Sequence, residues 1–174
     1  MKPLNPESEF SIVQEEELSL SGSALREILQ ETLSKGCSLR LRVRGFSMFP
    51  SIRDKDIITV SPLNGCVSYL GLAVAFIRPY ANKLVIHRVI QQYQDTVVIK
   101  GDCVSSIDGF ILRKNILGVV TKTERNNRCG RFGMGCERSL IIFCNKTNVF
   151  ATLFYIGMRL PRIIRQAIKY LFFT

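Results

Sequence analysis

Short apolar stretches, separated by turn-forming residues, recur between residues 39 and 122 and restrict the folds open to this chain. Residues 39–44 alternate strictly, with Leu39, Leu41 and Val43 on one side and three arginines on the other. This period of two is typical of a half-buried strand. Further strands are predicted at residues 57–60, 71–78, 83–91, 96–100 and 116–122, with turns at Pro62, Asn64-Gly65 and Pro79. We therefore expect a mainly β domain in which distant segments pair.

A helix is predicted directly before the strands. Its apolar positions share one face of a helical wheel and are Leu25, Ile28, Leu29 and Leu33. Ser21 or Ser23 can cap the start, and Gly36 suits the end. Residues 1–20 are polar and acidic, so we expect a flexible lead-in without a secretory signal. The helix and strands together predict one domain over residues 21–125.

The composition changes after residue 125. Residues 126–138 are rich in Gly, Asn and Arg and are predicted to form a loop, and residues 139–174 to form a basic amphipathic helical tail. The apolar positions near the C-terminus recur at helical spacing and are Leu160, Ile163, Ile164, Ala167, Ile168, Leu171 and Phe172. Upstream, an apolar stretch from residue 140 to 158 is interrupted by Lys146 and its polar neighbours, so it makes a poor spanning helix.

Charge is distributed unevenly along the 174 residues. The net charge is +10, and all of the excess positive charge lies after Leu112. That part of the chain has 12 basic residues and only two acidic ones, Glu124 and Glu137. Such a segment attracts anionic surfaces, either lipid or nucleic acid. We expect residues 139–174 to bind an anionic membrane surface. The alternative is that the apolar face of the tail packs on the β domain.

The cysteines do not suggest a metal site. The chain has six of them, none in a CxxC pair, and only one histidine. We expect reduced thiols, most of them small buried side chains, and neither a metal ion nor a cofactor.

The sequence GFSMFPSIRDKD, residues 45–56, places Ser47 between two apolar residues. A serine hydroxyl needs a nearby base to become a nucleophile. The only histidine, His87, shares a strand face with two valines, an apolar setting that favours the neutral ring a base requires. Asp102 and Asp108 follow, and either could orient the ring. The spacing of these residues in the sequence does not show that the serine, the histidine and a carboxylate meet in space. Each of them could equally be an ordinary turn or core residue.

Three ordered segments resemble the signal-peptidase and SOS-repressor group of serine peptidases (the S24/S26 group). GFSMFP at residues 45–50, followed by DKDII at 54–58, is similar to the serine box of that group. IHRVI at 86–90 resembles the base box of the branch that uses histidine, the endoplasmic-reticulum type of signal peptidase I. KGDC at 100–103, with Asp108 beyond it, and ILGVVTKTER at 116–125 resemble the segments that follow.

The resemblance implies a β half-barrel and a serine endopeptidase that cleaves a peptide or a leader-type or signal-type substrate through an acyl-enzyme. Ser47 would be the nucleophile and His87 the general base, with Asp102 as the first choice for the third member and Asp108 as the other candidate. The partner would be a peptide or protein substrate. We expect the protein in the cytoplasm or peripherally at the inner face of the membrane.

Several features depart from that family. The helix before the serine box is charged and amphipathic rather than spanning, Lys55 stands where a glycine is usual, and Gly45 supplies no hydroxyl for an oxyanion hole. A self-cleaving repressor would need a lysine base and a cleavage site upstream of the serine, whereas Cys129-Gly130 lies downstream. The alternative from another class is a non-catalytic, peptidase-like module that binds membrane or nucleic acid through the basic segment.

Overall fold

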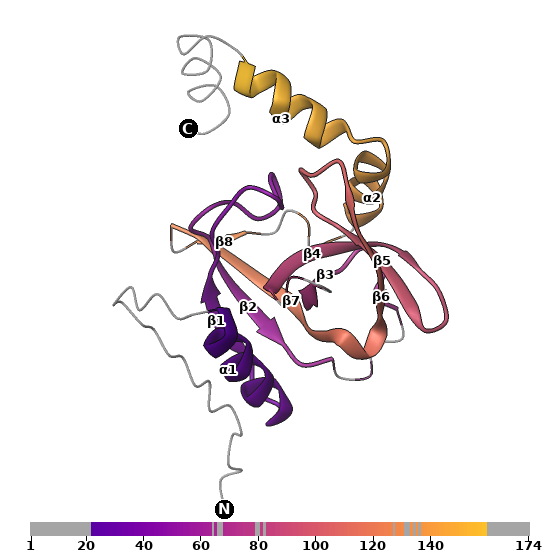
Figure 1. Cartoon of the computed structure of the whole chain (residues 1–174). Helices are drawn as coiled ribbons and strands as arrows, with labels where there is room; N and C mark the ends of the chain where they lie inside the picture. The colour runs from indigo at the N-terminus through magenta and orange to yellow at the C-terminus, as the bar shows by residue number, and fades with distance from the viewer. Residues whose placement is uncertain are drawn as a thin grey trace, which may run out of the picture.

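The computed structural model describes residues 22–63, 65, 68–78, 81, 83–126, 128–130, 133, 135 and 137–159. The protein is mainly β, with a single antiparallel sheet that curls into a half-barrel and a few helices around it (Figure 1). The strands are β1 (Leu39–Arg42), β2 (Ile57–Ser61), β3 (Ala73–Arg78), β4 (Lys83–Gln92), β5 (Thr96–Lys100), β6 (Ile107–Leu112), β7 (Ile116–Arg125) and β8 (Arg128–Gly130). The helices are α1 (Gly22–Ser34), α2 (Arg138–Lys146), α3 (Val149–Arg159) and the short 3-10 turn η1 (Arg113–Asn115).

Sheet order differs from chain order at one place. The strands lie in the order β1-β2-β7-β3-β4-β5-β6, and β8 pairs with β7. β7 thus lies between β2 and β3, although both precede it in the chain. Register shifts interrupt four of the pairings, one of them between Val89 and Gln91 of β4. Such irregularities increase local twist and let a sheet curl.

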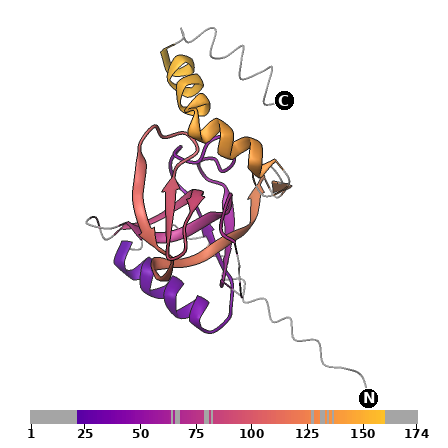
Figure 2. The same cartoon turned by 90° about the vertical axis from the view of Figure 1, so that its right-hand side faces the viewer.

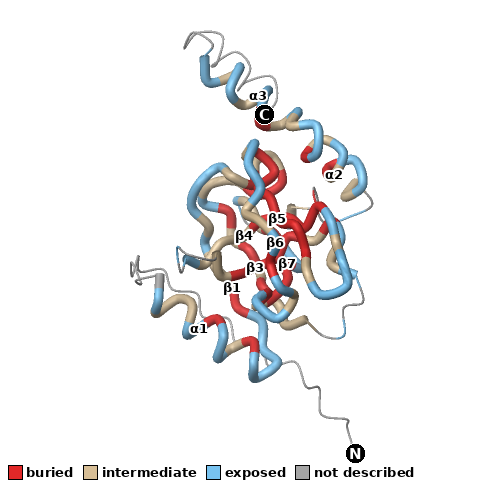
Figure 3. Tube along the Cα trace, turned by 45° about the vertical axis from the view of Figure 1, so that its right-hand side comes forward, coloured by how far each residue is buried: buried red, intermediate tan, exposed pale blue. Residues whose placement is uncertain are grey.

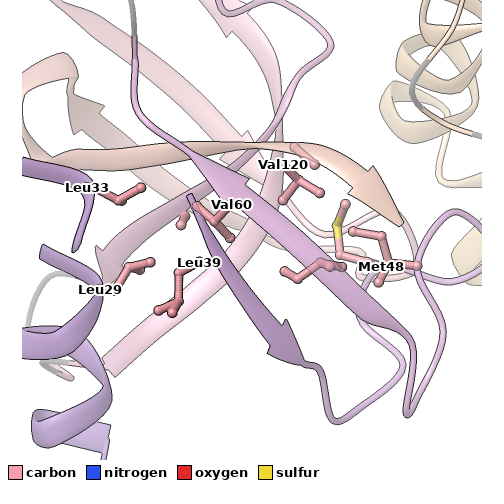
Figure 4. Close-up of a cluster of buried hydrophobic side chains, with 10 residues drawn as sticks. Leu29, Leu33, Leu39, Met48, Val60 and Val120 are labelled. Atoms are coloured by element: carbon pink, nitrogen blue, oxygen red, sulfur yellow. The ribbon is translucent and has the colours of Figure 1, made fainter. Parts of the chain in front are cut away.

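The two faces of the sheet carry separate apolar clusters, as the alternation along β3 shows. Ala73 and Ala75 pack with Leu29 and Leu33 of α1, whereas Val74 and Phe76 belong to the other cluster. Figure 4 shows the first cluster, in which α1 lies over the sheet and Met48 enters from the loop after β1. The period of two in the strands and the helical stripe in α1 therefore account for the core.

Most elements of the β domain lie where the sequence predicts them. α1 and strands β1 to β5 agree with the prediction to within two residues at either end, and β7 begins as predicted but continues to Arg125. β6 was not predicted, because its sequence, IDGFIL, carries an aspartate and a glycine at positions where a strand pattern needs larger side chains. β8 lies within residues 126–138, so this segment is not entirely a loop as predicted.

The C-terminal helices lie at the end of the sheet opposite to α1 (Figures 1 and 2). α2 docks on the β domain through Ile141 and Asn145, and the first turn of α3 contains the buried Ala151. Beyond that contact α3 is largely exposed, as Figure 3 shows. The predicted helix after Arg159 lies outside the described residues.

Candidate active site

Ser47 lies on a loop that two apolar side chains fix to the core. Met48 and Ile52 are 4% and 3% exposed and belong to the cluster beneath α1. Backbone hydrogen bonds close the base of the loop, from Val43 N to Asp56 O and from Lys55 N to Val43 O, each 2.9 Å long. The serine itself is half-buried. Anchors on both sides of the turn hold its main chain in one position.

The acidic turn after the serine has a structural role. Asp54 accepts a hydrogen bond from the main-chain N–H of Gly45, and the buried Asp56 accepts two from the guanidinium of Arg125 on β7. Lys55 between them has a φ of 68°, in the left-handed region. The chain therefore adopts at Lys55 the conformation for which glycine is suited, at some cost in strain.

His87 lies in β4 with its ring almost fully buried, at 3% exposure. It pairs in register with Val74 of β3, and its ring centroid is 6.4 Å from that of Phe76. Phe76 packs in one cluster with Val89 and Val85, the two valines that share the face of His87. The environment is apolar, as the alternation of β4 predicted.

Asp108 of β6 contacts this ring. Its Oδ2 lies 2.5 Å from Nδ1 of His87, and its Oδ1 accepts a hydrogen bond from Arg78 of β3. Burial by itself would raise the pKa of Asp108, but the hydrogen bonds and charges of His87 and Arg78 outweigh it and hold the pKa below its usual value. An ionised carboxylate at Nδ1 places the proton on that nitrogen and leaves Nε2 as the acceptor.

The main-chain carbonyl oxygen of Ser47 and Nε2 of His87 both lie next to Gly101. A side-chain carbon added at Gly101 would lie 2.7 Å from the carbonyl oxygen of Ser47 and 3.0 Å from Nε2. The loop after β5 also holds the main chain of Ser47 in place, because Cys103 N donates a 2.8 Å hydrogen bond to Ser47 O. Within the described part of the chain, the Ser47 hydroxyl makes no hydrogen bond. Such bonds are often long without substrate and shorten when it binds.

Asp102 points away from His87 into a buried polar network. Its two oxygens accept hydrogen bonds from Nε and Nη2 of Arg88 at 2.8 and 2.9 Å. Ser51 Oγ donates to Oδ2 at 2.5 Å, and Asn145 Nδ2 of α2 donates to Oδ1 at 2.8 Å. Asp108, and not Asp102, therefore lies beside the imidazole in the structure. The sequence had favoured Asp102, but the carboxylate of Asp102 is paired with the guanidinium of Arg88 instead.

The sequence reasoning did not single out Arg88, Lys100 or Asn145. Arg88 is fully buried and also donates to the carbonyl oxygens of Gly71 and Gly133, at 2.7 and 3.0 Å. Lys100 donates to the carbonyl oxygen of Asn145 at the end of α2. The signal that could have indicated such a network is a charged residue at an inward position of an apolar strand, since buried charges are normally paired.

Among the described residues, no group of three His, Cys, Asp or Glu side chains is arranged to hold a metal ion. Comparisons of the whole sequence and structure with protein-family models, with curated proteins and with solved structures give no match.

Proposed function

We propose that this protein is a serine endopeptidase of the signal-peptidase-like kind, with Ser47 as nucleophile, His87 as general base and Asp108 as the carboxylate that orients the imidazole. The observation that carries the proposal is the position of His87. One edge of its ring meets a carboxylate, and Nε2 on the other edge lies next to Gly101, which also adjoins the main-chain oxygen of Ser47. A base held by a third group and turned toward a hydroxyl is the arrangement that activates a serine.

The chemistry follows from these positions. The Ser47 oxygen attacks the carbonyl carbon of a peptide bond while its proton passes to Nε2 of His87, and Asp108 stabilises the imidazolium. The tetrahedral intermediate collapses, the C–N bond breaks, and His87 returns the proton to the leaving amine. Water then hydrolyses the ester on Ser47 with the same imidazole as base. The main-chain N–H of Ser47 is the nearest candidate donor to the oxyanion.

The role proposed for Asp102 is structural. Its network joins Arg88 next to the base, Ser51 on the nucleophile loop and Asn145 on α2. One carboxylate therefore ties together the strand of His87 and the loop of Ser47. The curled antiparallel sheet is also the kind of scaffold that the resemblance to signal peptidases implies, which supports the assignment to that group.

A fluorophosphonate probe tests the proposal on the full-length protein. Such probes react covalently with an activated serine and not with ordinary hydroxyls. We expect labelling that disappears in Ser47→Ala and slows strongly in His87→Gln. Ser105→Ala, at an exposed serine in the turn before β6, is the matched control and should label like the wild type.

Labelling of Ser47→Ala at the wild-type rate would refute the assignment of the nucleophile. A folded wild-type protein that takes up no probe would instead favour the non-catalytic module, which binds its partner through the basic C-terminal segment. If the wild type is labelled, digestion of a peptide library, with the products identified by mass spectrometry, defines the cleaved sequence. Ser47→Ala should give no such products.

A further inference from the structure

An apolar surface lies next to the candidate nucleophile and is formed mainly by α2 and α3. Its members are at least 38% exposed and are Phe46, Leu140, Phe143, Val149, Leu153, Tyr155, Ile156 and Met158. They project from several sides of α3 rather than from one stripe. A helix that is apolar nearly all round is normally surrounded by an apolar medium, and clustered exposure of this kind marks an interaction site.

The surface is continuous with the loop of Ser47. The ring centroid of Phe154 in α3 lies 6.1 Å from that of Phe46 and 5.9 Å from that of Phe49. These two phenylalanines flank the Ser47-Met48 dipeptide. Whatever covers α3 therefore comes within a few side chains of the proposed reaction centre.

The helices are attached to the β domain at their junction. Lys100 Nζ donates to Asn145 O and to Asn148 Oδ1, at 2.5 and 2.6 Å. Cys103 Sγ donates to Phe150 O at 3.8 Å. Lys100 ends β5 and Cys103 lies in the loop that follows, on either side of Gly101, so the apolar surface has a fixed orientation relative to His87 and Ser47.

The positive charge of the C-terminal segment indicates what binds to this apolar surface. From Arg138 to Thr174 the sequence has six basic residues and no acidic one. Lys146 and Arg159 stand at the C-terminal ends of α2 and α3, beside the exposed apolar side chains. Apolar and aromatic side chains bordered by lysine and arginine are the pattern of a segment that lies in the interface of an anionic bilayer.

The bend between α2 and α3 suits a segment that lies in the interface. Within the described ranges no single helix is long and apolar enough to span a membrane, and α2 with α3 meets that standard only as a pair bent by 69°. The bend at residues 147 and 148 is fixed by Lys100.

We propose that α2, α3 and Phe46 form a docking surface for anionic membranes, which holds Ser47 close to the lipid surface. The docking itself does not depend on catalysis.

The absence of tryptophan from the chain gives a direct test. Leu153→Trp places a single reporter on the surface, and Tyr93→Trp places one at the exposed turn between β4 and β5 as the control. With vesicles of phosphatidylglycerol and phosphatidylcholine, we expect a blue shift of Leu153→Trp emission and none for Tyr93→Trp. Raising the ionic strength, or using vesicles of phosphatidylcholine alone, should weaken binding.

A second pair of variants measures the apolar contribution by vesicle sedimentation. Leu153→Asp with Ile156→Asp should lower the partition coefficient by on the order of 100-fold, whereas Tyr93→Asp should leave it unchanged. Ser47→Ala should bind like the wild type, so a failure of the peptidase proposal would not be mistaken for a failure of docking. An unshifted Leu153→Trp spectrum, or a dimer in sedimentation velocity that the double variant dissociates, would overturn the proposal.

Discussion

The carboxylate of Asp108 lies 2.5 Å from Nδ1 of His87, although β5 separates their two strands in the sheet. The curl of the sheet brings the two side chains together, and the guanidinium of Arg78 donates to the same carboxylate. The pair fixes both the orientation and the tautomer of the ring, and each of these is needed for a base directed at Ser47.

Asp108→Asn is expected to lower the rate of probe labelling and of peptide cleavage by about 10²–10⁴-fold. The amide can accept a hydrogen bond from Nδ1 but cannot stabilise an imidazolium, and it can also select the wrong tautomer. Circular dichroism should show an unchanged fold. Activity equal to the wild type would show that the carboxylate does not assist His87.

Asp102→Ala is expected to act on stability first. It leaves Arg88 fully buried without its carboxylate, a change that typically costs about 3–5 kcal/mol. Urea unfolding followed by circular dichroism measures the loss. Asp102→Asn, which retains one hydrogen-bond acceptor, should be less harmful than Asp102→Ala. If Asp102→Asn were as stable as the wild type but inactive, Asp102 would have a catalytic role that its contacts do not suggest.

Gly101→Ala tests the approach of Ser47 to His87. The added carbon would meet Ser47 O at 2.7 Å and Nε2 of His87 at 3.0 Å, so the two groups must move apart. Displacements of about 1 Å in a catalytic constellation can cost about 10²-fold in rate. Gly157→Ala is the control, because a carbon there meets nothing within 4 Å. A Gly101→Ala protein with full labelling would contradict the proposed geometry.

Lys55→Gly is expected to stabilise the protein by about 0.5–1 kcal/mol, because glycine adopts the φ of 68° without strain, although it is more flexible when unfolded. The midpoint of urea unfolding should rise at constant slope. Lys83→Gly in β4, at another exposed lysine, should lower the midpoint instead. A lower midpoint for Lys55→Gly would mean that its side chain makes contacts worth more than the strain.

The sequence predicted the β domain well because its strands have a clear period of two and its turns contain Gly, Pro and Asn. It did not predict β6, where pairing with β5 overrides the low strand propensity of Asp108 and Gly109. Local patterns carry no information on such tertiary pairing, so the sequence favoured Asp102 over Asp108, whereas the contacts in the structure place Asp108 beside His87.

The docking of α2 could not be predicted for a related reason. Residues 139–159 are apolar on average, which suits a membrane segment and a packed helix equally. What distinguishes them is the polar junction at Asn145 and Asn148, which pairs with Lys100 from a strand 45 residues away. The local sequence around a lysine at the end of a strand does not predict a partner so distant in sequence.

The thiol of Cys103 provides a probe of that junction. Burial raises its pKa to about 11, assisted by the charge of Asp102, so it is a thiol and not a thiolate at neutral pH. Cys37 and Cys129 are exposed. Iodoacetamide at about pH 8 should therefore modify these two cysteines in the native protein and spare Cys103, as peptide mass mapping would reveal, because only an accessible thiolate reacts. In urea, Cys103 should react like the others. Native Cys103 that reacts as fast as Cys37 would mean that α2 and α3 separate from the loop of Gly101, and the orientation proposed for the apolar surface would then fail.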